Sequence, residues 1–506
     1  MKYIISIACS LLLIVEIFCI KIIPIIKETF PLENTDAVIF TLTQNVEGSR
    51  DFVMSLFWDA FKNAFFMSFL LLLLSFIFLL ITYFLFNRGV LKIARVPSYR
   101  TLIILLDVGC FVLLTKCVCS EIPLADYYVA WKDSLDVPEH SEFYAKEYVN
   151  PDSVLIKFKE KKNLILVFLE SMEYNFQDSA NGGNLPTNLI PEITEYIKSE
   201  QSFIPGGTQV AGMGWTIADV VAKTCGIPLV LPPSIRNDFK IMKDFFPGAM
   251  CLTDILINSG YNVVVSKGAN LKFSGMDAFL NSHSAPQSFG LIEYLKDKQR
   301  VKVDAISEWG IKDSLHYELI KGHIERISKQ EQPWAIWFIT LNTHTPFGIV
   351  DSTCNISMDI SKSEQMQSVI SCSSRQLDQF IKWAKKQDWF DNTVIAVMGD
   401  HATMAAPDVI GFKDLNITHY WLDFFINSSQ NTENTKRSFT SLDMFPTILE
   451  AIGADLPNRA LGLGRSLYSP EPTLLEKYGM DSLNKALGKR SVEYDSFHFL
   501  SRKRLP

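Results

Sequence analysis

The chain has 506 residues, 48% of them hydrophobic, and a formal net charge of -7. This length predicts more than one structural unit, and the negative charge argues against nucleic acid as a partner. Most of the apolar excess lies in the first quarter of the chain.

Three stretches in that first quarter have the character of transmembrane helices. Residues 4–20 contain one acidic residue, residues 64–86 contain no charge, and residues 102–118 contain one acidic residue and one lysine. About 20 apolar residues cross the hydrocarbon of a bilayer, so the second stretch is long enough by itself. We interpret the first stretch as an uncleaved anchor rather than a signal peptide, because no A-x-A site follows it. The third is either a span or a re-entrant helix.

The basic residues around these stretches predict their orientation. The loop at 88–100 has four basic residues and no acidic one, whereas the loop at 21–62 mixes both signs. The positive-inside rule therefore places the loop at 88–100 in the cytoplasm. With three spans, everything after Glu121 lies outside the cytoplasm.

Four of the nine cysteines fall in the part that is expected to be exported: Cys225, Cys251, Cys354 and Cys372. An even number permits two disulfides, and proximity in the sequence favours pairs of Cys225 with Cys251 and of Cys354 with Cys372. Neither pair has the spacing of metal ligands. Four buried free thiols remain the alternative.

The pattern divides the chain into a transmembrane region at 1–122, an interfacial connector at 123–162, a large exported domain at 163–470 and a solvated C-terminal tail at 471–506. Short runs rich in β-branched and aliphatic residues predict buried strands at 164–170, 261–266, 335–341 and 393–400. Helical periodicity lies between them at 190–200, 250–260 and 373–387. This alternation predicts an α/β domain around a mainly parallel sheet.

Two of the predicted strands end in residues that bind metals. Glu170 closes the first strand, and Asp400 with His401 closes the last. In open α/β sheets, ligands collect beyond the carboxyl ends of the strands, so the three side chains are expected to converge on one ion. Carboxylate oxygen with imidazole nitrogen suits Zn²⁺ or Mn²⁺. Taken singly, a carboxylate after a strand is more often a helix N-cap.

The stretch GMGWTIADVVAKTCGIPLV, residues 212–230, places one hydroxyl at the start of a predicted helix. Free N–H groups and the positive end of the dipole suit a phosphate there, and Gly212 and Gly214 allow the backbone to approach a ligand. Coordination to a divalent cation would make the Thr216 hydroxyl a nucleophile. The alternative is that Thr216 is an ordinary N-cap.

These motifs together carry a resemblance. NLILVFLES, GMGWTIADVVAKTCGIPL, LNTHTPF, MGDHATM and RSFTSLDMFPTILEAIGADLP occur in this order between residues 163 and 467. They resemble the membrane-anchored phosphoglycerol transferases of the alkaline phosphatase and sulfatase superfamily. The most similar branch modifies periplasmic glucans, and lipoteichoic acid synthases are more distant.

The resemblance implies roles for five residues. Glu170, Thr216, Asp400 and His401 match the metal ligands of the family, and Thr216 also matches its nucleophile. His344 matches a histidine that contacts the transferred phosphoryl group. The expected cofactor is a divalent metal, Mn²⁺ first, with Zn²⁺ and Mg²⁺ as alternatives.

The resemblance also implies an activity and a place. The protein is expected to transfer a glycerophosphoryl group from phosphatidylglycerol to a sugar hydroxyl of a periplasmic or cell-surface glycan, through a covalent threonine intermediate. Its expected location is the bacterial inner membrane, as a multi-pass protein with a periplasmic catalytic domain. The identity of the glycan and the oligomeric state have no readable signal in the sequence.

Two further polar residues, His419 and Arg375, are candidate substrate contacts that match no family motif, so a core or surface role is the expectation for both. Five other histidines show no ligand spacing: His140, His283, His316, His323 and His498. Trp215, beside the nucleophile, either packs as a wall or touches substrate.

Three other functions remain open. A phosphoethanolamine transferase shares the anchor and the threonine nucleophile and differs in the donor head group. A sulfatase needs a C/S-x-P-x-R motif, and the sequence around Cys225 lacks its arginine. A catalytically inactive module that binds lipid or glycan is the alternative from another class.

Overall fold

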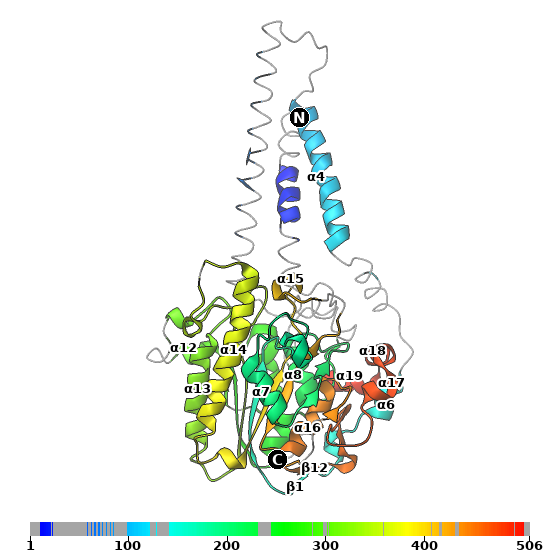
Figure 1. Cartoon of the computed structure of the whole chain (residues 1–506). Coiled ribbons are helices and arrows are strands. Elements are labelled where there is room, and N and C mark those ends of the chain that lie inside the picture. The colour runs from blue at the N-terminus through cyan, green and yellow to red at the C-terminus, as the bar shows by residue number, and fades with distance from the viewer. Residues whose placement is uncertain are drawn as a thin grey trace. The chain divides into compact units, whose positions relative to one another are not determined.

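The computed structural model describes residues 11–21, 99–121, 141–230 and 244–499, with short gaps at 286, 297–300, 302, 358, 406, 414–416, 431–434 and 490, and single positions between 23 and 128. Two compact units make up the chain. One lies within the first 132 residues, and the other contains residues 133–506. Figure 1 shows the chain coloured from its N-terminus to its C-terminus.

The described part of the first unit is helical. Residues 11–21 form a helix, and α4, Tyr99–Glu121, contains the third predicted span. Among the helices that the described residues form, none is both long and apolar enough to cross a membrane. Most of the second predicted span, part of the first and nearly all of the basic loop lie outside the described residues.

A six-stranded sheet forms the centre of the second unit, in the order β10-β8-β2-β7-β5-β6. Five strands are parallel to their neighbours, and β10 at one edge is antiparallel. The strands are β2 Asn163–Leu169, β5 Asn262–Lys267, β6 Gln287–Phe289, β7 Trp334–Ile339, β8 Thr393–Gly399 and β10 Asp423–Ile426. The four predicted strands and the mainly parallel sheet are therefore confirmed, and the sequence analysis missed β6 and β10.

Every residue of β2, β5, β7 and β8 is buried, because helices cover both faces of the sheet. Alternate side chains of β2 enter different cores: Leu164, Leu166 and Phe168 enter one, and Ile165 and Val167 enter the other. The first core is shared with α8 Thr216–Cys225, α10 Leu252–Asn258 and α16 Met444–Ala451, and the second with α7 Pro191–Ser199, α13 Asp313–Ile327 and α14 Lys362–Ala384. Figure 1 shows α13 and α14 side by side.

Short elements complete the unit. The two-stranded pairs are β1 Lys157–Phe158 with β12 Ala454–Asp455, β3 Phe203–Ile204 with β11 Thr435–Lys436, β4 Gly207–Thr208 with β9 Tyr420–Trp421, and β13 Ala460–Leu461 with β14 Gly464–Arg465. The short helices are α6 Phe143–Glu147, α11 Met276–Ser282, α12 Leu291–Leu295, α15 Pro407–Ile410, α17 Leu474–Tyr478, α18 Met480–Leu487 and α19 Val492–Phe499.

Both favoured disulfides are present. Cys225–Cys251 joins the C-terminus of α8 to the residue that precedes α10, and Cys354–Cys372 joins a short turn to α14. The first of these ties the end of the helix that begins with Thr216 to its neighbour in the core.

The solvated tail predicted for residues 471–506 is wrong for residues 474–499. α17, α18 and α19 bury apolar side chains in the core that contains α8: Leu474, Leu475, Leu483, Leu487, Tyr494 and Phe497. A capping-box sequence, Thr473 with Glu476, begins α17 and was an available signal.

The predicted connector also extends too far into the domain. Tyr144 in α6 is 1% exposed and donates a hydrogen bond to the main-chain oxygen of Leu487 at 3.1 Å. The residues from 141 to 162 that form α6 and β1 therefore pack with the C-terminal helices and the sheet rather than forming a separate segment.

Candidate metal centre and nucleophile

Two parallel strand ends bring three of the predicted ligands together. Leu169 of β2 lies opposite Gly399 of β8, so the residues that follow them leave the sheet at the same edge. Glu170 follows β2, and Asp400 and His401 follow β8. Each of the three offers one ligand atom, and these atoms all lie within 4.8 Å of one another. All three side chains are buried.

Hydrogen bonds orient the two carboxylates. Asp400 Oδ1 accepts from the N–H groups of Ser171 at 2.7 Å and His401 at 2.8 Å. Ser171 Oγ donates to Glu170 Oε1 at 2.7 Å. Asp400 Oδ2, in contrast, is buried and has no hydrogen-bond partner among the described residues. A buried carboxylate oxygen in that state is costly unless it meets a cation.

The imidazole of His401 is oriented for a cation as well. Its Nδ1–H donates to the main-chain oxygen of Ala402 at 2.8 Å, which leaves the lone pair of Nε2 toward the carboxylates. Nε2 lies 3.4 Å from Asp400 Oδ2 and 3.6 Å from Glu170 Oε1. Burial opposes protonation of His401, but Asp400 and Glu170 outweigh it and raise its pKa.

Thr216 adds a hydroxyl to this cluster. Thr216 Oγ1 lies 3.4 Å from Glu170 Oε2 and 3.5 Å from His401 Nε2. It is the first residue of α8, while Trp215 occupies the N-cap position in extended conformation. The alternative that Thr216 is an ordinary N-cap is therefore wrong. Trp215 is 6% exposed and packs in the core, as a wall.

Gly212 shapes the turn before the nucleophile helix. Its φ is +77°, and a Cβ there would lie 3.0 Å from the main-chain nitrogen of Leu229. Its carbonyl accepts a hydrogen bond from that N–H at 2.9 Å. The glycine thus closes the loop at 212–229 onto itself, which fixes the start of α8.

These residues fit a divalent cation. Two carboxylates, one imidazole nitrogen and one hydroxyl form an oxygen-rich donor set, and Asp400 Oδ2 is without a hydrogen-bond partner there. Burial and the nearby Glu170 raise the pKa of Asp400 to about 6, and a bound cation would reverse that effect. The second group of candidate ligands, Cys225, Cys251 and His283, does not fit, because its sulfur atoms form a disulfide.

His344 follows β7 at the same edge of the sheet. Its Nδ1–H donates to the main-chain oxygen of Thr345 at 2.8 Å, and its ring lies 4.1 Å from that of Trp309. Burial lowers the pKa of His344 to about 4. The neutral ring therefore presents Nε2 as an acceptor, which suits a substrate hydroxyl. The ring would donate a hydrogen bond from Nε2 to a phosphoryl oxygen only after protonation.

The sequence analysis missed Lys267. It is the last residue of β5, it is 6% exposed, and its ammonium lies 5.3 Å from the centre of the Phe273 ring. Burial lowers its pKa to about 8, although Glu170 and Asp400 favour its charged form. Its position as the last residue of a buried strand is only a weak signal, because a lysine there is usually solvated. Lys267 supplies positive charge to the site.

A buried ion pair lies below the cluster. Lys223 and Asp219 of α8 are paired, and Ser441 Oγ donates to the same aspartate. Lys223 Nζ also lies 3.8 Å from the centre of the Trp421 ring. This network joins α8 to Ser441 and to Trp421 of β9.

The remaining candidates have other surroundings. His419 is paired with Glu173, and Arg375 is exposed on α14. His140 lies outside the described residues. The other four histidines have structural contacts: His283 with Asp254, His316 with Ser266, His323 with Tyr294 and His498 with Phe246.

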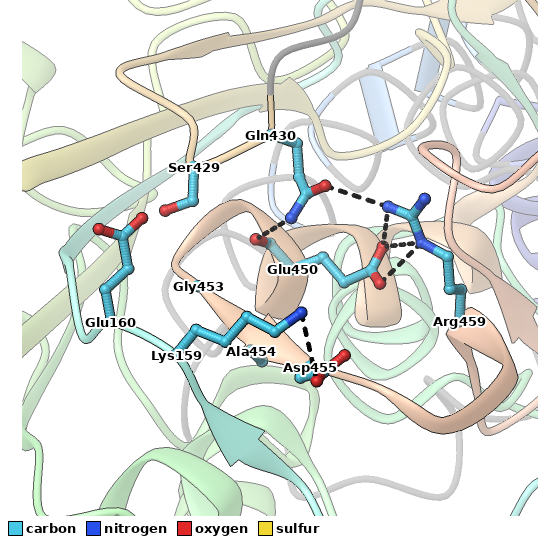
Figure 2. Close-up of a pocket in the computed structure, with 9 residues that line it drawn as sticks. All are labelled: Lys159, Glu160, Ser429, Gln430, Glu450, Gly453, Ala454, Asp455 and Arg459. Carbon is cyan, nitrogen blue, oxygen red and sulfur yellow. Dashed lines mark hydrogen bonds and ion pairs between the residues drawn. The ribbon is translucent and has the colours of Figure 1, made fainter.

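A separate polar cavity of about 470 Å³ lies near the amino-terminal end of β2, at the opposite end of that strand from Glu170. Lys159 and Glu160 line it shortly before β2 begins, whereas Glu170 follows β2. Figure 2 shows Arg459 held between Glu450 and Gln430 in this cavity, so its guanidinium is occupied by the protein. The cavity is therefore distinct from the metal-binding cluster.

Comparisons with known proteins show which families and solved structures the chain resembles. Residues 233–454 match the family model described as Sulfatase. Phosphoglycerol transferase I of Escherichia fergusonii is 35% identical over 318 residues, which are 61% of this chain and 39% of that protein. The protein of the same name from Salmonella arizonae is 33% identical over 344 residues, 66% of this chain and 41% of that protein. The chain thus spans about two fifths of the length of these relatives.

Solved structures share the fold. A protein of the alkaline phosphatase superfamily from Vibrio parahaemolyticus has a TM-score of 0.51 and 21% identity. The match covers 66% of this chain and 78% of that protein. The lipoteichoic acid synthase LtaP from Listeria monocytogenes has a TM-score of 0.53 and 15% identity. The match covers 70% of this chain and 98% of that protein. Residues 233–454 are therefore similar to the Sulfatase family, the second unit shares its α/β fold with these two solved structures, and the chain is similar in sequence to phosphoglycerol transferase I.

Proposed function

We propose that the protein is a metal-dependent phosphotransferase that moves a glycerophosphoryl group from phosphatidylglycerol to a sugar hydroxyl of a periplasmic or cell-surface glycan. The observation that carries this proposal is the position of Thr216 Oγ1, within 3.5 Å of both Glu170 and His401 at the N-terminus of α8. The similarity to phosphoglycerol transferase I supports the choice of the transferred group.

Glu170, Thr216, Asp400 and His401 would hold the cation, and Mn²⁺, Zn²⁺ and Mg²⁺ all accept this donor set. The bound cation would lower the pKa of the Thr216 hydroxyl and offset negative charge on the transferred group. Mn²⁺ is our first expectation. The residues themselves fix the geometry, through the hydrogen bonds that orient Asp400 and His401.

The reaction proceeds in two displacements. Thr216 Oγ attacks the phosphorus of the lipid, and diacylglycerol leaves as a covalent glycerophosphoryl-threonine forms. A sugar hydroxyl then attacks that phosphorus and frees Thr216. The N-terminus of α8 and the Lys267 ammonium stabilise the negative charge of each transition state, and the Nε2 acceptor of His344 suits a glycerol hydroxyl.

We also propose that the N-terminal region anchors this domain to the inner membrane of a bacterium, with the domain in the periplasm. The apolar stretches at 4–20, 64–86 and 102–118 and the basic loop at 88–100 support this placement. The two disulfides suit an oxidising compartment. In this arrangement the catalytic unit, from about residue 141 to 499, meets its lipid donor at the membrane surface.

Release of diacylglycerol tests the proposal. The purified 506-residue chain in detergent with Mn²⁺ is given fluorescent phosphatidylglycerol or phosphatidylethanolamine, beside Thr216→Ala. Release from phosphatidylglycerol alone, lost in the variant and with chelator, is the expected result. Release from phosphatidylethanolamine alone would identify a phosphoethanolamine transferase. No release from either lipid with Mn²⁺, Zn²⁺ or Mg²⁺ would favour a module that only binds lipid or glycan.

A further inference from the structure

A second histidine–carboxylate pair lies beside the metal-binding cluster. His419, which precedes β9, places Nδ1 2.9 Å from Glu173 Oε2 and 3.0 Å from Oε1. The Glu173 side chain is fully buried, whereas one third of the His419 side chain is exposed. The buried carboxylate thus holds a partly exposed imidazole ring.

The pair is attached to both strand ends that carry the ligands. Glu173 lies three residues after Glu170, and its Oε1 accepts a hydrogen bond at 2.7 Å from the N–H of Thr403, two residues after His401. Glu173 also bridges the backbone of Trp421 in β9. The imidazole of His419 is therefore fixed relative to the cluster by three segments of the chain.

The two other histidines at this edge of the sheet are not suited to donate a proton to a leaving group. His401 directs Nε2 into the cluster, and burial keeps His344 neutral. In His419, Nδ1–H donates to Glu173, and this hydrogen bond raises the pKa of the ring. Nε2 of His419 has no hydrogen-bond partner within the described part of the chain. An imidazole that is oriented by a buried carboxylate and partly exposed is an arrangement suited to acid–base catalysis.

We propose that His419 Nε2 is the proton donor and acceptor of the transfer reaction and that Glu173 positions it; this assignment rests on the proposed function. In the first displacement, ionised Thr216 Oγ bonds to phosphorus, the bond from phosphorus to the diacylglycerol oxygen breaks, and the Nε2 proton moves to that oxygen. In the second, the sugar oxygen bonds to phosphorus, its proton moves to Nε2, and the bond to Thr216 breaks. Each cycle returns His419 and Thr216 to their starting protonation states.

A change of leaving group tests this assignment. Glycerophosphoryl 4-nitrophenol releases a stable phenolate that needs no proton, whereas phosphatidylglycerol releases an alkoxide that does. The 506-residue chain with Mn²⁺ is assayed on both donors, beside His419→Ala and Glu173→Gln. His323→Gln is the matched control, because His323 is a half-buried histidine that hydrogen-bonds Tyr294 away from the cluster.

We expect His419→Ala to reduce the rate on phosphatidylglycerol about 10²- to 10⁴-fold and the rate on the nitrophenyl donor less than about tenfold. Glu173→Gln should show the same selective loss to a smaller extent, and the control should show none. Equal losses on both donors, or no loss on either, would overturn the assignment. An unmodified chain inactive on both donors would instead contradict the proposed function itself.

Discussion

Lys223 donates a hydrogen bond from Nζ to the main-chain oxygen of Asp400 at 2.7 Å. The lysine belongs to the helix that begins with Thr216, and the aspartate directly follows β8. The buried Lys223 therefore links α8 to the candidate metal centre. This link explains how segments almost two hundred residues apart keep the geometry of one site.

Loss of the buried Lys223 ammonium should destabilise the domain. Lys223→Met removes the ionic partner of the buried Asp219, so we expect a loss of about 3–5 kcal/mol in the free energy of unfolding. Lys382→Met is the matched control, since Lys382 also pairs with an aspartate four residues earlier but is largely exposed. Denaturant unfolding of the two variants measures the difference. Similar midpoints for both would contradict a structural role of the Lys223 network.

Metal affinity should fall at acidic pH. Burial raises the pKa of Asp400 to about 6, so below that pH the carboxyl group holds a proton that a cation must displace. His401, whose pKa is also raised, changes affinity in the same direction. The apparent Kd for Mn²⁺ should therefore rise as the pH falls through about 6, by up to about tenfold per pH unit for each proton displaced.

Calorimetric titration between pH 5 and 8, values chosen to bracket that pKa, would measure this dependence. Asp400→Asn is the control, because the amide removes the titrating oxygen and should abolish tight binding at every pH. Mn²⁺ affinity that does not vary with pH, or that survives in Asp400→Asn, would place the metal elsewhere.

Lys267 should act through its charge. Lys267→Met removes an ammonium from the edge of the site, and loss of one group that stabilises transition-state charge lowers the rate about 10²- to 10³-fold. Lys267→Arg keeps the charge and should retain more activity. The exposed Lys272, five residues later, gives the control Lys272→Met, with no change in rate. Equal rates for Lys267→Met and Lys267→Arg would show that charge is not the property that matters.

The C-terminal helices should contribute to folding. Leu483 is fully buried in α18, so Leu483→Ala should cost about 2–5 kcal/mol of stability. Lys485→Ala, two residues away on the exposed side of the same helix, should change little. Thermal unfolding with Mn²⁺ present distinguishes them. An unchanged midpoint for Leu483→Ala would restore the view that this segment is a tail.

The centre of the sheet and the cluster could be predicted because each signal is local. A continuous apolar run such as that of β2 predicts a buried strand, and parallel strands place Glu170 and Asp400 at one edge. The disulfides followed from proximity in the sequence. Thr216 was located by its glycine-rich turn.

Other features depend on contacts between distant segments. Glu173 and His419 are separated by 246 positions, and no local sequence pattern predicts that they pair. Lys267 is inconspicuous because a lysine at a strand end is usually solvated. The C-terminal helices are short and polar on one side, so their burial depends on an apolar surface that α8 and α6 provide.

Detection of a modified Thr216 tests the central claim most directly. The 506-residue chain would be incubated with Mn²⁺ and phosphatidylglycerol without an acceptor, quenched in acid and digested, and the peptide containing Thr216 analysed by tandem mass spectrometry. We predict a glycerophosphoryl group on Thr216, absent in Thr216→Ala and removed when a glycan acceptor is added. Release of diacylglycerol with Thr216 unmodified, or with the group on another residue, would contradict the account.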